Sequence, residues 1–315
     1  MKAPKRFDYT EMKNGLLLMI WGLFLKLVIA DRAAIWANTV YDDYLSFTGY
    51  QLSLATVAFA IQIYCDFSSY SIIATGAAQV MGFRLMENFN TPYFAVSIAD
   101  FWHRWHISLS TWFRDYLYIP LGGSRNGKAR KYLNTMIVFL VSGIWHGAAW
   151  KFVIWGALNG VYQIAGEITA PLRKKLAGAA RNGAPPFSRK LMSGFVTFFL
   201  VCVSWVFFRA DDANTALEML ARIFSGFGFS LKDCGLQLLA STGMDGKDLA
   251  VFAVSLALLL AVSLCKYKKV RLREALSRQG LWLRWAVYLA AIFLVMVFGL
   301  YGATYNENAY IYFQF

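Results

Sequence analysis

The sequence predicts an all-α, polytopic integral membrane protein. Its 315 residues are 58% hydrophobic and only 16% charged, whereas soluble domains are roughly 45–50% apolar and about 25% charged. A soluble core cannot absorb such an excess, but a bilayer can. Apolar runs long enough to cross about 30 Å of hydrocarbon recur along the chain. The runs expected to span the membrane are 15–30, 52–82, 133–166, 191–208, 249–267 and 281–302.

The distribution of positive charge predicts the orientation of the chain. The segments 1–14, 83–131, 171–190 and 266–284 hold 24 of the 31 Lys and Arg residues, whereas 31–51 and 209–248 hold five. Because cytoplasmic loops collect Lys and Arg, the first set is expected in the cytoplasm and residues 301–315 on the other side. This rule accounts for the formal net charge of +13, so no nucleic-acid partner is expected.

The run 133–166 fits a single crossing poorly, because basic residues flank it on both sides, at 125–131 and 173–175. It is either a helix–break–helix that enters the membrane and returns, with the break at 142–147, or one long tilted helix. Irregular backbone at membrane depth persists only where protein or water surrounds it. Both alternatives stay open, and both place His146 in the middle of the segment.

Shorter segments complete the predicted single membrane domain over residues 1–315. Aromatic and charged residues alternate irregularly over 97–119, which is typical of an interfacial helix, and 211–225 predicts a short amphipathic helix on the outer surface. The run that begins near Leu16 is expected to be a retained span rather than a cleaved signal peptide. Three of the four cysteines (Cys65, Cys202, Cys234 and Cys265) lie in apolar stretches, so we interpret them as small core residues.

The three histidines His103, His106 and His146 are the main candidates for chemistry. An ionisable group within a membrane segment is a functional candidate. Next to Gly143 and Gly147, a neutral His146 could take a proton from a hydroxyl that attacks an acyl donor. The alternative is a structural histidine bonded to a neighbouring carbonyl. His103 and His106 could share one helix face and form a metal site with His146, but carboxylate partners are scarce there, and no metal is expected.

Two polar groups allow both a functional and a structural interpretation. The segment 66–71, Asp-Phe-Ser-Ser-Tyr-Ser, either bonds across helices or lines a polar tunnel. Arg104, Arg114 and the cluster 125–131 either meet the phosphates of a donor such as coenzyme A or lie at the interface as topology determinants. Neither a phosphate-binding loop motif nor a dinucleotide-binding motif occurs in the sequence.

Two stretches resemble a known family. Residues 100–123, DFWHRWHISLSTWFRDYLYIPLGG, closely resemble the signature of the membrane-bound O-acyltransferase family, in the bacterial branch of the alginate O-acetylase membrane component and the teichoic-acid D-alanylation protein. Residues 143–150, GIWHGAAW, followed by FVIWG at 152–156, are similar to its second signature. The ending YIYFQF at 310–315 is similar to the alginate-acetylase subgroup.

The resemblance implies a fold and a site. The fold would be a ring of helices around a central funnel or tunnel, with interfacial and re-entrant helices. His146 matches the catalytic histidine, and His106 matches the second polar position of the active site. His103 falls where relatives usually carry Arg or another polar residue. The residues expected to contact the donor are Arg104, Arg114, Trp105 and Ser108.

The resemblance also implies an activity. We expect acetyl groups to pass from cytosolic acetyl-CoA, without a bound cofactor, across a bacterial cytoplasmic (inner) membrane to a secreted or cell-wall polysaccharide. A periplasmic or extracellular acetyltransferase is the expected partner, besides membrane lipid. The alternatives are D-alanyl transfer from a carrier protein to teichoic acid, and a transporter without covalent chemistry. Family members usually carry further helices before the stretch equivalent to Phe7, so the chain is expected to lack N-terminal helices.

Overall fold

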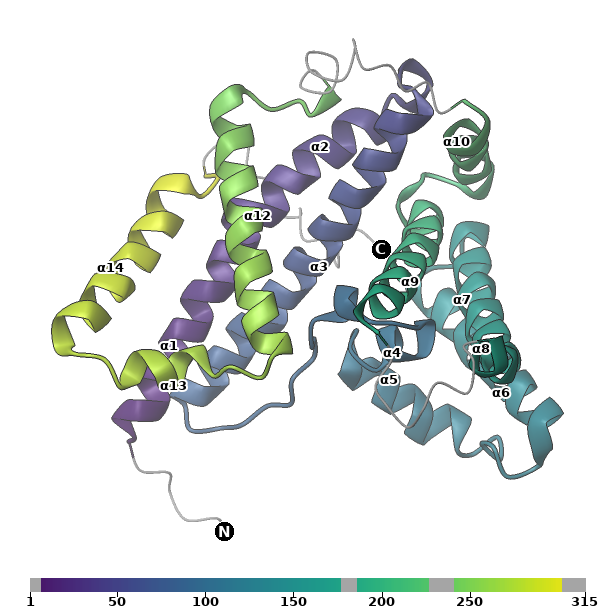
Figure 1. The fold of residues 1–315 in the computed structure, drawn as a ribbon, viewed down its shortest axis with the longest axis horizontal. Helices are drawn as coiled ribbons and strands as arrows, with labels where there is room; N and C mark the ends of the chain where they lie inside the picture. The colour runs from purple at the N-terminus through teal and green to yellow at the C-terminus, as the bar shows by residue number, and fades with distance from the viewer. Residues whose placement is uncertain (1–6, 177–185, 227–240, 302–315) are drawn as a thin grey trace. The chain divides into compact units, whose positions relative to one another are not determined.

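The computed structural model describes residues 7–176, 186–226 and 241–301. In these ranges every regular element is a helix, and no strand occurs, so the predicted all-α class is confirmed. The chain forms two compact units, Met1–Glu87 with Phe227–Phe315 and Asn88–Gly226 (Figure 1). The single domain over 1–315 and the central funnel stay predictions.

The first unit contains α1 (Tyr9–Phe24), α2 (Asp31–Tyr41), α3 (Gly49–Val80), α12 (Gly246–Tyr267), α13 (Leu272–Ser277) and α14 (Leu281–Phe298).

The first unit is built on a close antiparallel pair of helices. Helix α1, a π-helical turn at Leu25–Ala30 and α2 follow one another without a break and pack along α3 (Figure 1). A Cβ at Gly15 would lie 2.5 Å from the carbonyl oxygen of Gly76, and one at Gly22 would lie 3.0 Å from that of Ser69. The two backbones are therefore in contact, as small residues allow in membrane helices.

A buried ionic cluster joins these two helices at the π-helical turn. The ammonium group of Lys26, 2% exposed, lies 2.6 Å from Asp66 Oδ1 and 2.9 Å from Asp31 Oδ1. Ser69 donates a hydrogen bond to the carbonyl oxygen of Asp66. Asp66 therefore pairs across helices, which is the first of the two interpretations of the segment 66–71.

A second buried cation connects α12 and α14 to this pair. The guanidinium group of Arg32 donates to Asp248 Oδ1 at 2.8 Å and to the carbonyl oxygen of Phe298 at 2.6 Å. It also donates to the carbonyl oxygen of Val28, one turn earlier. One side chain thus satisfies acceptors on three separate helical segments.

Four of the described helices are long and apolar enough to cross a membrane: α3, α9 (Phe187–Arg209), α12 and α14. They confirm the membrane assignment and four of the six predicted spans. The run 15–30 is instead divided between α1 and the π-helical turn, where Lys26 needs its two carboxylate partners. The run 133–166 forms two helices, so of its two interpretations the helix–break–helix is the observed one.

The second unit contains seven α-helices in the described residues, besides a 3-10 turn at Pro92–Phe94 and a π-helical turn at Arg114–Tyr118. The α-helices are α4 (Ile98–Trp102), α5 (Ile107–Phe113), α6 (Gly127–His146), α7 (Trp150–Ile168), α8 (Ala170–Leu176), α9 and α10 (Ala213–Ser225). Helix α10 confirms the amphipathic helix predicted at 211–225, and Asp212 caps it through a 2.8 Å hydrogen bond from the N–H of Thr215. Cys65, Cys202 and Cys265 are free thiols, and Cys234 lies outside the described residues.

The prediction of one continuous helix over 97–119 is wrong. Helix α4 ends at Trp102, α5 begins at Ile107, and a π-helical turn follows at Arg114–Tyr118. His106 adopts a left-handed conformation with φ +44°, which a right-handed helix cannot contain. Backbone hydrogen bonds to the loop around Asn88 replace the helical ones, since the N–H of Ile107 donates to the carbonyl of Asn88 and the N–H of Asn90 donates to the carbonyl of Arg104. His103 and His106 therefore share no helix face.

Replacing Lys26 with Met should strongly destabilise the first unit. Two carboxylates would remain buried without a countercharge, and breaking a buried pair from one side costs about 3–5 kcal/mol. The free energy of unfolding of the purified chain in detergent micelles measures this loss. The double variant Lys26→Met/Asp66→Leu should recover much of it, and a stable single variant would contradict the buried cluster.

Candidate functional site

Helices α6 and α7 form an antiparallel hairpin that carries His146 at its tip. Helix α6 ends at His146, residues 147–149 leave the helical conformation, and α7 begins at Trp150. At the other end Lys131 of α6 pairs with Glu167 of α7 at 2.5 Å. The two basic flanks of this segment therefore lie at the same end of the hairpin, as the charge distribution indicates for a segment that enters and returns.

Glycines allow the two helices to touch. A Cβ at Gly143 would overlap the carbonyl oxygen of Phe152, and one at Gly156 would overlap that of Phe139. At the turn, a Cβ at Gly147 would lie 2.6 Å from the ring of Phe152. No larger residue fits these positions without separating the helices, so the glycines set the position of the tip.

The ring of His146 is half-buried among aromatic side chains. Its centroid lies 5.2 Å from that of Trp155 on α7 and 5.1 Å from that of Phe208 on α9, both nearly perpendicular. Phe152 lies on a further side at 6.4 Å. Neither ring nitrogen of His146 forms a hydrogen bond with a described residue. Aromatic packing therefore orients the imidazole and leaves its nitrogens available to a ligand.

A lysine fixes the end of α9 against this tip. Lys151 donates from Nζ to the carbonyl oxygen of Ala210 at 2.8 Å and lies 4.9 Å from the centre of the Phe152 ring. Ala210 follows the last turn of α9, two residues after Phe208. This hydrogen bond thus connects the start of α7, which carries Phe152, to the end of α9, which carries Phe208.

His106 is held by a hydrogen bond with the side chain of Asn88. Asn88 Oδ1 accepts hydrogen bonds from Ser108 Oγ at 2.9 Å and from the N–H of Ser108 at 3.1 Å, and it lies 3.2 Å from His106 Nδ1. Because a carbonyl oxygen accepts, Nδ1 carries the proton, and Nε2 is the basic nitrogen of His106. The left-handed backbone of His106 is the kind of strain that clusters at functional sites.

The two histidines lie within electrostatic range of each other. Burial, and to a smaller extent the positive charge that His146 would carry, lower the pKa of His106 to about 3. His106 is therefore neutral at physiological pH. The structure brings the two predicted catalytic residues into one neighbourhood, with His106 in the neutral form that donates from Nδ1.

The four residues predicted to contact the donor have different surroundings. Arg104 donates to Asp100 at 2.7 Å and to Thr91 at 3.3 Å. Trp105 is 4% exposed and packs against the ring of Phe101. Their contact with a donor stays a prediction, as does that of Ser108, which supports Asn88.

Arg114 is the predicted donor-binding residue that faces open space. It is exposed, pairs with Asp115 at 2.8 Å and lines a cavity of about 410 Å³. Other lining residues with polar groups are His103, Ser110, Thr111, Tyr118, Lys131, Thr135, Gln163 and Glu167. Gln163 Oε1 is buried and has no hydrogen-bond partner among the described residues. The cavity is thus polar, with donors and acceptors available.

The cavity and His146 belong to different ends of the hairpin. Lys131 and His146 are 15 residues apart on α6, which corresponds to about 22 Å of helix. Trp102 lines the cavity and packs on Trp155, which in turn contacts His146. The indole N–H groups of Trp102, Trp155 and Trp205 are buried and have no partner in the described part of the chain.

His103 has a local role. It is exposed, and its Nδ1 lies 2.5 Å from the carbonyl oxygen of Ala99, one turn earlier. Among the described residues no group of three or more His, Cys, Asp or Glu side chains is placed to hold a metal ion.

Sequence reasoning did not identify Asn88, Lys151, Trp155 or Phe208 as parts of the site. Asn88 stands in a loop without a recognisable pattern, 18 residues before His106. Phe208 resembles any other apolar residue of a spanning helix. The Gly and Trp residues around His146 were the only local signals, and they pointed to the hairpin rather than to its partners on α9.

Comparisons with known proteins identify the family of the chain. A model of the MBOAT, membrane-bound O-acyltransferase family, matches residues 5–208. That range includes both histidines and the whole hairpin. The match extends over about two thirds of the chain.

Individual relatives carry related names. The probable alginate O-acetylase AlgI of Pseudomonas syringae pv. tomato is 37% identical over 84% of this chain and 48% of its own length. The peptidoglycan O-acetyltransferase of Helicobacter pylori is 32% identical over 100% and 59%. The teichoic acid D-alanyltransferase of Bacillus subtilis is 29% identical over 66% and 53%. The chain spans about half the length of the curated relatives it matches.

Replacing Gly156 with Ala should separate the two hairpin helices, because the added methyl group overlaps the Phe139 carbonyl oxygen. Overpacking of this kind costs about 1–3 kcal/mol, and we expect a lower thermal unfolding midpoint and a changed tryptophan fluorescence. Gly166→Ala on the same helix is the matched control. A Cβ there meets nothing within 4 Å, so that variant should be as stable as the parent or slightly more so. Equal behaviour of the two variants would contradict the close contact.

Proposed function

The chain belongs to the membrane-bound O-acyltransferase family, and on that premise we propose that it transfers acetyl groups across the membrane for O-acetylation of a polysaccharide. One observation carries the proposal. His146 stands at the tip of a glycine-packed hairpin, oriented by aromatic rings, with neither ring nitrogen bonded to a described residue. A histidine needed only for structure would be expected to bond a neighbouring carbonyl or side chain.

In the proposed reaction His146 is the general base. It takes the proton from an acceptor hydroxyl as that oxygen forms a bond to the carbonyl carbon of the thioester. The carbon–sulfur bond then breaks, and the thiolate leaves with the proton that His146 returns. Neutral His106, held by Asn88 and Ser108, offers Nε2 as an acceptor that would position a donor group of the site, such as the acceptor hydroxyl.

The carbonyl oxygen gains negative charge as the hydroxyl attacks, so preorganised N–H donors would accelerate the reaction. The unpartnered indole N–H groups of Trp155 and Trp205 belong to the aromatic cluster around His146. They support a site that receives an oxygen acceptor from a ligand.

The proposed donor is cytosolic acetyl-CoA, used as a substrate rather than held as a cofactor. The cavity lined by Arg114 is suited to its phosphates, because guanidinium groups bind phosphate oxygens in a fixed geometry. The thioester would then reach along the hairpin to His146. Trp102, between the cavity and the aromatic cluster, would have to move or be passed.

The proposed acceptor is an exopolysaccharide or cell-wall polymer, reached with the help of a periplasmic or extracellular acetyltransferase. The proposed location is the cytoplasmic membrane of a bacterium. The names of the alginate and peptidoglycan relatives favour acetyl transfer to such a polymer. The D-alanyltransferase relative favours a second candidate, D-alanyl transfer from a carrier protein to teichoic acid. Release of free coenzyme A from labelled acetyl-CoA separates acetyl transfer both from this candidate and from a transporter.

His146→Ala should abolish polymer O-acetylation, because the attacking hydroxyl loses its base, and losses of about 100-fold to 10,000-fold follow removal of such a group. Val141→Ala is the control, since Val141 is an exposed residue of the same helix that lines neither the cavity nor the aromatic cluster. O-acetyl content of the polymer is measured in cells that contain each variant at equal levels. Undiminished O-acetylation with His146→Ala would exclude the mechanism.

Asn88→Asp should change the pH dependence of the reaction. A carboxylate in place of the amide raises the pKa of His106 from its low value, because it stabilises the charged imidazolium. His106 would then take up a proton as the pH falls through the raised pKa, and the rate would fall at acidic pH more than in the parent. Rate profiles between pH 5 and 8 measure the effect. A parallel profile for both proteins would mean that Asn88 does not act through His106.

A further inference from the structure

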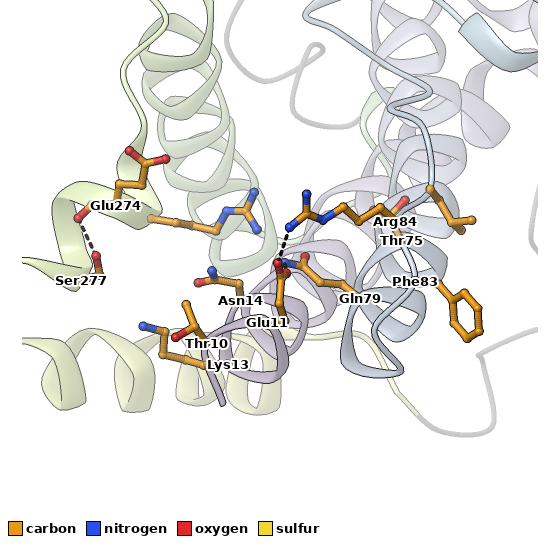
Figure 2. A pocket seen from close by; sticks show the side chains of 12 residues that line it. Thr10, Glu11, Lys13, Asn14, Thr75, Gln79, Phe83, Arg84, Glu274 and Ser277 are labelled. Atoms are coloured by element: carbon orange, nitrogen blue, oxygen red, sulfur yellow. Dashed lines mark hydrogen bonds and ion pairs between the residues drawn. The ribbon is translucent and has the colours of Figure 1, made fainter. Parts of the chain in front are cut away.

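The first unit contains a cavity of about 450 Å³ that the proposed reaction does not use. Its walls come from the beginning of α1, the end of α3, the loop that follows α3, and α13 (Figure 2). The beginning of α1, the loop after α3 and α13 belong to stretches rich in Lys and Arg that the charge distribution places in the cytoplasm, and the end of α3 belongs to the predicted span 52–82.

Charges in the cavity do not balance. Three cations line it (Lys13, Arg84 and Arg273), together with two carboxylates (Glu11 and Glu274). Each carboxylate has a cationic partner. Glu11 accepts a 2.8 Å bond from Arg84 and a further bond from Gln79 (Figure 2), and Glu274 pairs with Arg271 at 2.9 Å.

The excess charge belongs to Lys13 and Arg273. Neither forms a hydrogen bond or an ion pair with a described residue. Both nonetheless line the same space, and hydrogen bonds from Gln79 and Arg84, followed by the charges of Arg84 and Arg273, hold the pKa of Glu11 below its usual range. Two cations from different helices thus line one cavity, and neither forms an ion pair with a carboxylate of the described residues.

The remaining lining suits an anion with an apolar part. The hydroxyl of Thr10 and the amide of Asn14 are neutral donors beside Lys13 (Figure 2). Phe83 and Leu85, 55% and 54% exposed, provide an apolar edge. Phosphate oxygens accept from such cations and donors, and an apolar edge suits the glycerol and acyl groups of a lipid.

We propose that this cavity binds a phosphate group between Lys13 and Arg273, supplied by the headgroup of an anionic phospholipid or by a free phosphate. The basic ends of these helices are predicted to face the cytoplasm, where the headgroups of anionic lipids are the most abundant source of phosphate groups. The site does not depend on acyl transfer, because it belongs to the first unit and is measured without substrates.

The test compares two double variants of the full chain that carry the same change of charge. Lys13→Gln/Arg273→Gln removes the two unpaired cations of the cavity, and Lys268→Gln/Arg278→Gln removes two exposed cations on either side of α13 that do not line it. Native mass spectrometry of the chain in detergent, titrated with phosphatidylglycerol or phosphatidylcholine, measures lipid occupancy. We expect about 30-fold weaker phosphatidylglycerol binding for the first variant and little change for the second.

Competition with inorganic phosphate distinguishes the two sources. If the chain retains phosphatidylglycerol in preference to phosphatidylcholine, and millimolar phosphate displaces little of it, the cavity is a site for a lipid headgroup. If inorganic phosphate binds only when Lys13 and Arg273 are present, and the chain does not distinguish phosphatidylglycerol from phosphatidylcholine, the cavity is a site for free phosphate. Equal binding of both ligands by the two double variants, each with the parent's unfolding temperature, would overturn the proposal.

Discussion

A charge buried away from water must find its partner within the protein, and this constraint organises the first unit. Lys26 would be costly to bury alone, because the desolvation of an ammonium group exceeds most single interactions. Asp66 and Asp31 offset this cost at 2.6 and 2.9 Å. The partners come from the helix across and from the next turn, so the cluster fixes the register between α1 and α3. Arg32 extends the same principle to α12 and α14 through Asp248 and the carbonyl of Phe298. Most residues of α12 and α14 are not buried in the protein, and a few polar contacts thus position these two helices.

In the second unit several buried polar groups also find partners, and some of those that do not lie close together around His146. Lys151 donates to the end of α9, Arg104 donates to Asp100, and Asn134 donates to two loop carbonyls. His146 has only rings around it, and the indole donors beside it are also unpartnered in the described residues. Unsatisfied groups that gather at one place are expensive unless a ligand satisfies them. The aromatic rings orient the imidazole, and in the proposed reaction its nitrogens bond the reacting groups.

Much of the fold follows from the sequence, because apolar runs and basic flanks are properties of contiguous residues. The spans α3, α9, α12 and α14 fall where the sequence places them, and the helix break, predicted at 142–147, lies at 147–149. The π-helical turn at Lys26 and the left-handed His106 could not be predicted, since both depend on partners 18 to 40 residues away in the sequence. For the site, His146 and His106 were predictable from local motifs. Asn88 was not, because its role arises only when a distant loop reaches the break between α4 and α5.

The hairpin explains why a returning segment suits this site better than a crossing helix. In a continuous helix every backbone group around residue 146 would be bonded within the helix, and the side chain would project sideways into its neighbours. Ending α6 at His146 releases the following residues, and the glycine contact at Gly143 and Gly156 allows the return without a gap. The same contact sets the separation between the polar end at Lys131 and the aromatic end at His146. A close backbone contact between two helices thereby determines both where a charged donor could bind and where its acyl group would have to arrive.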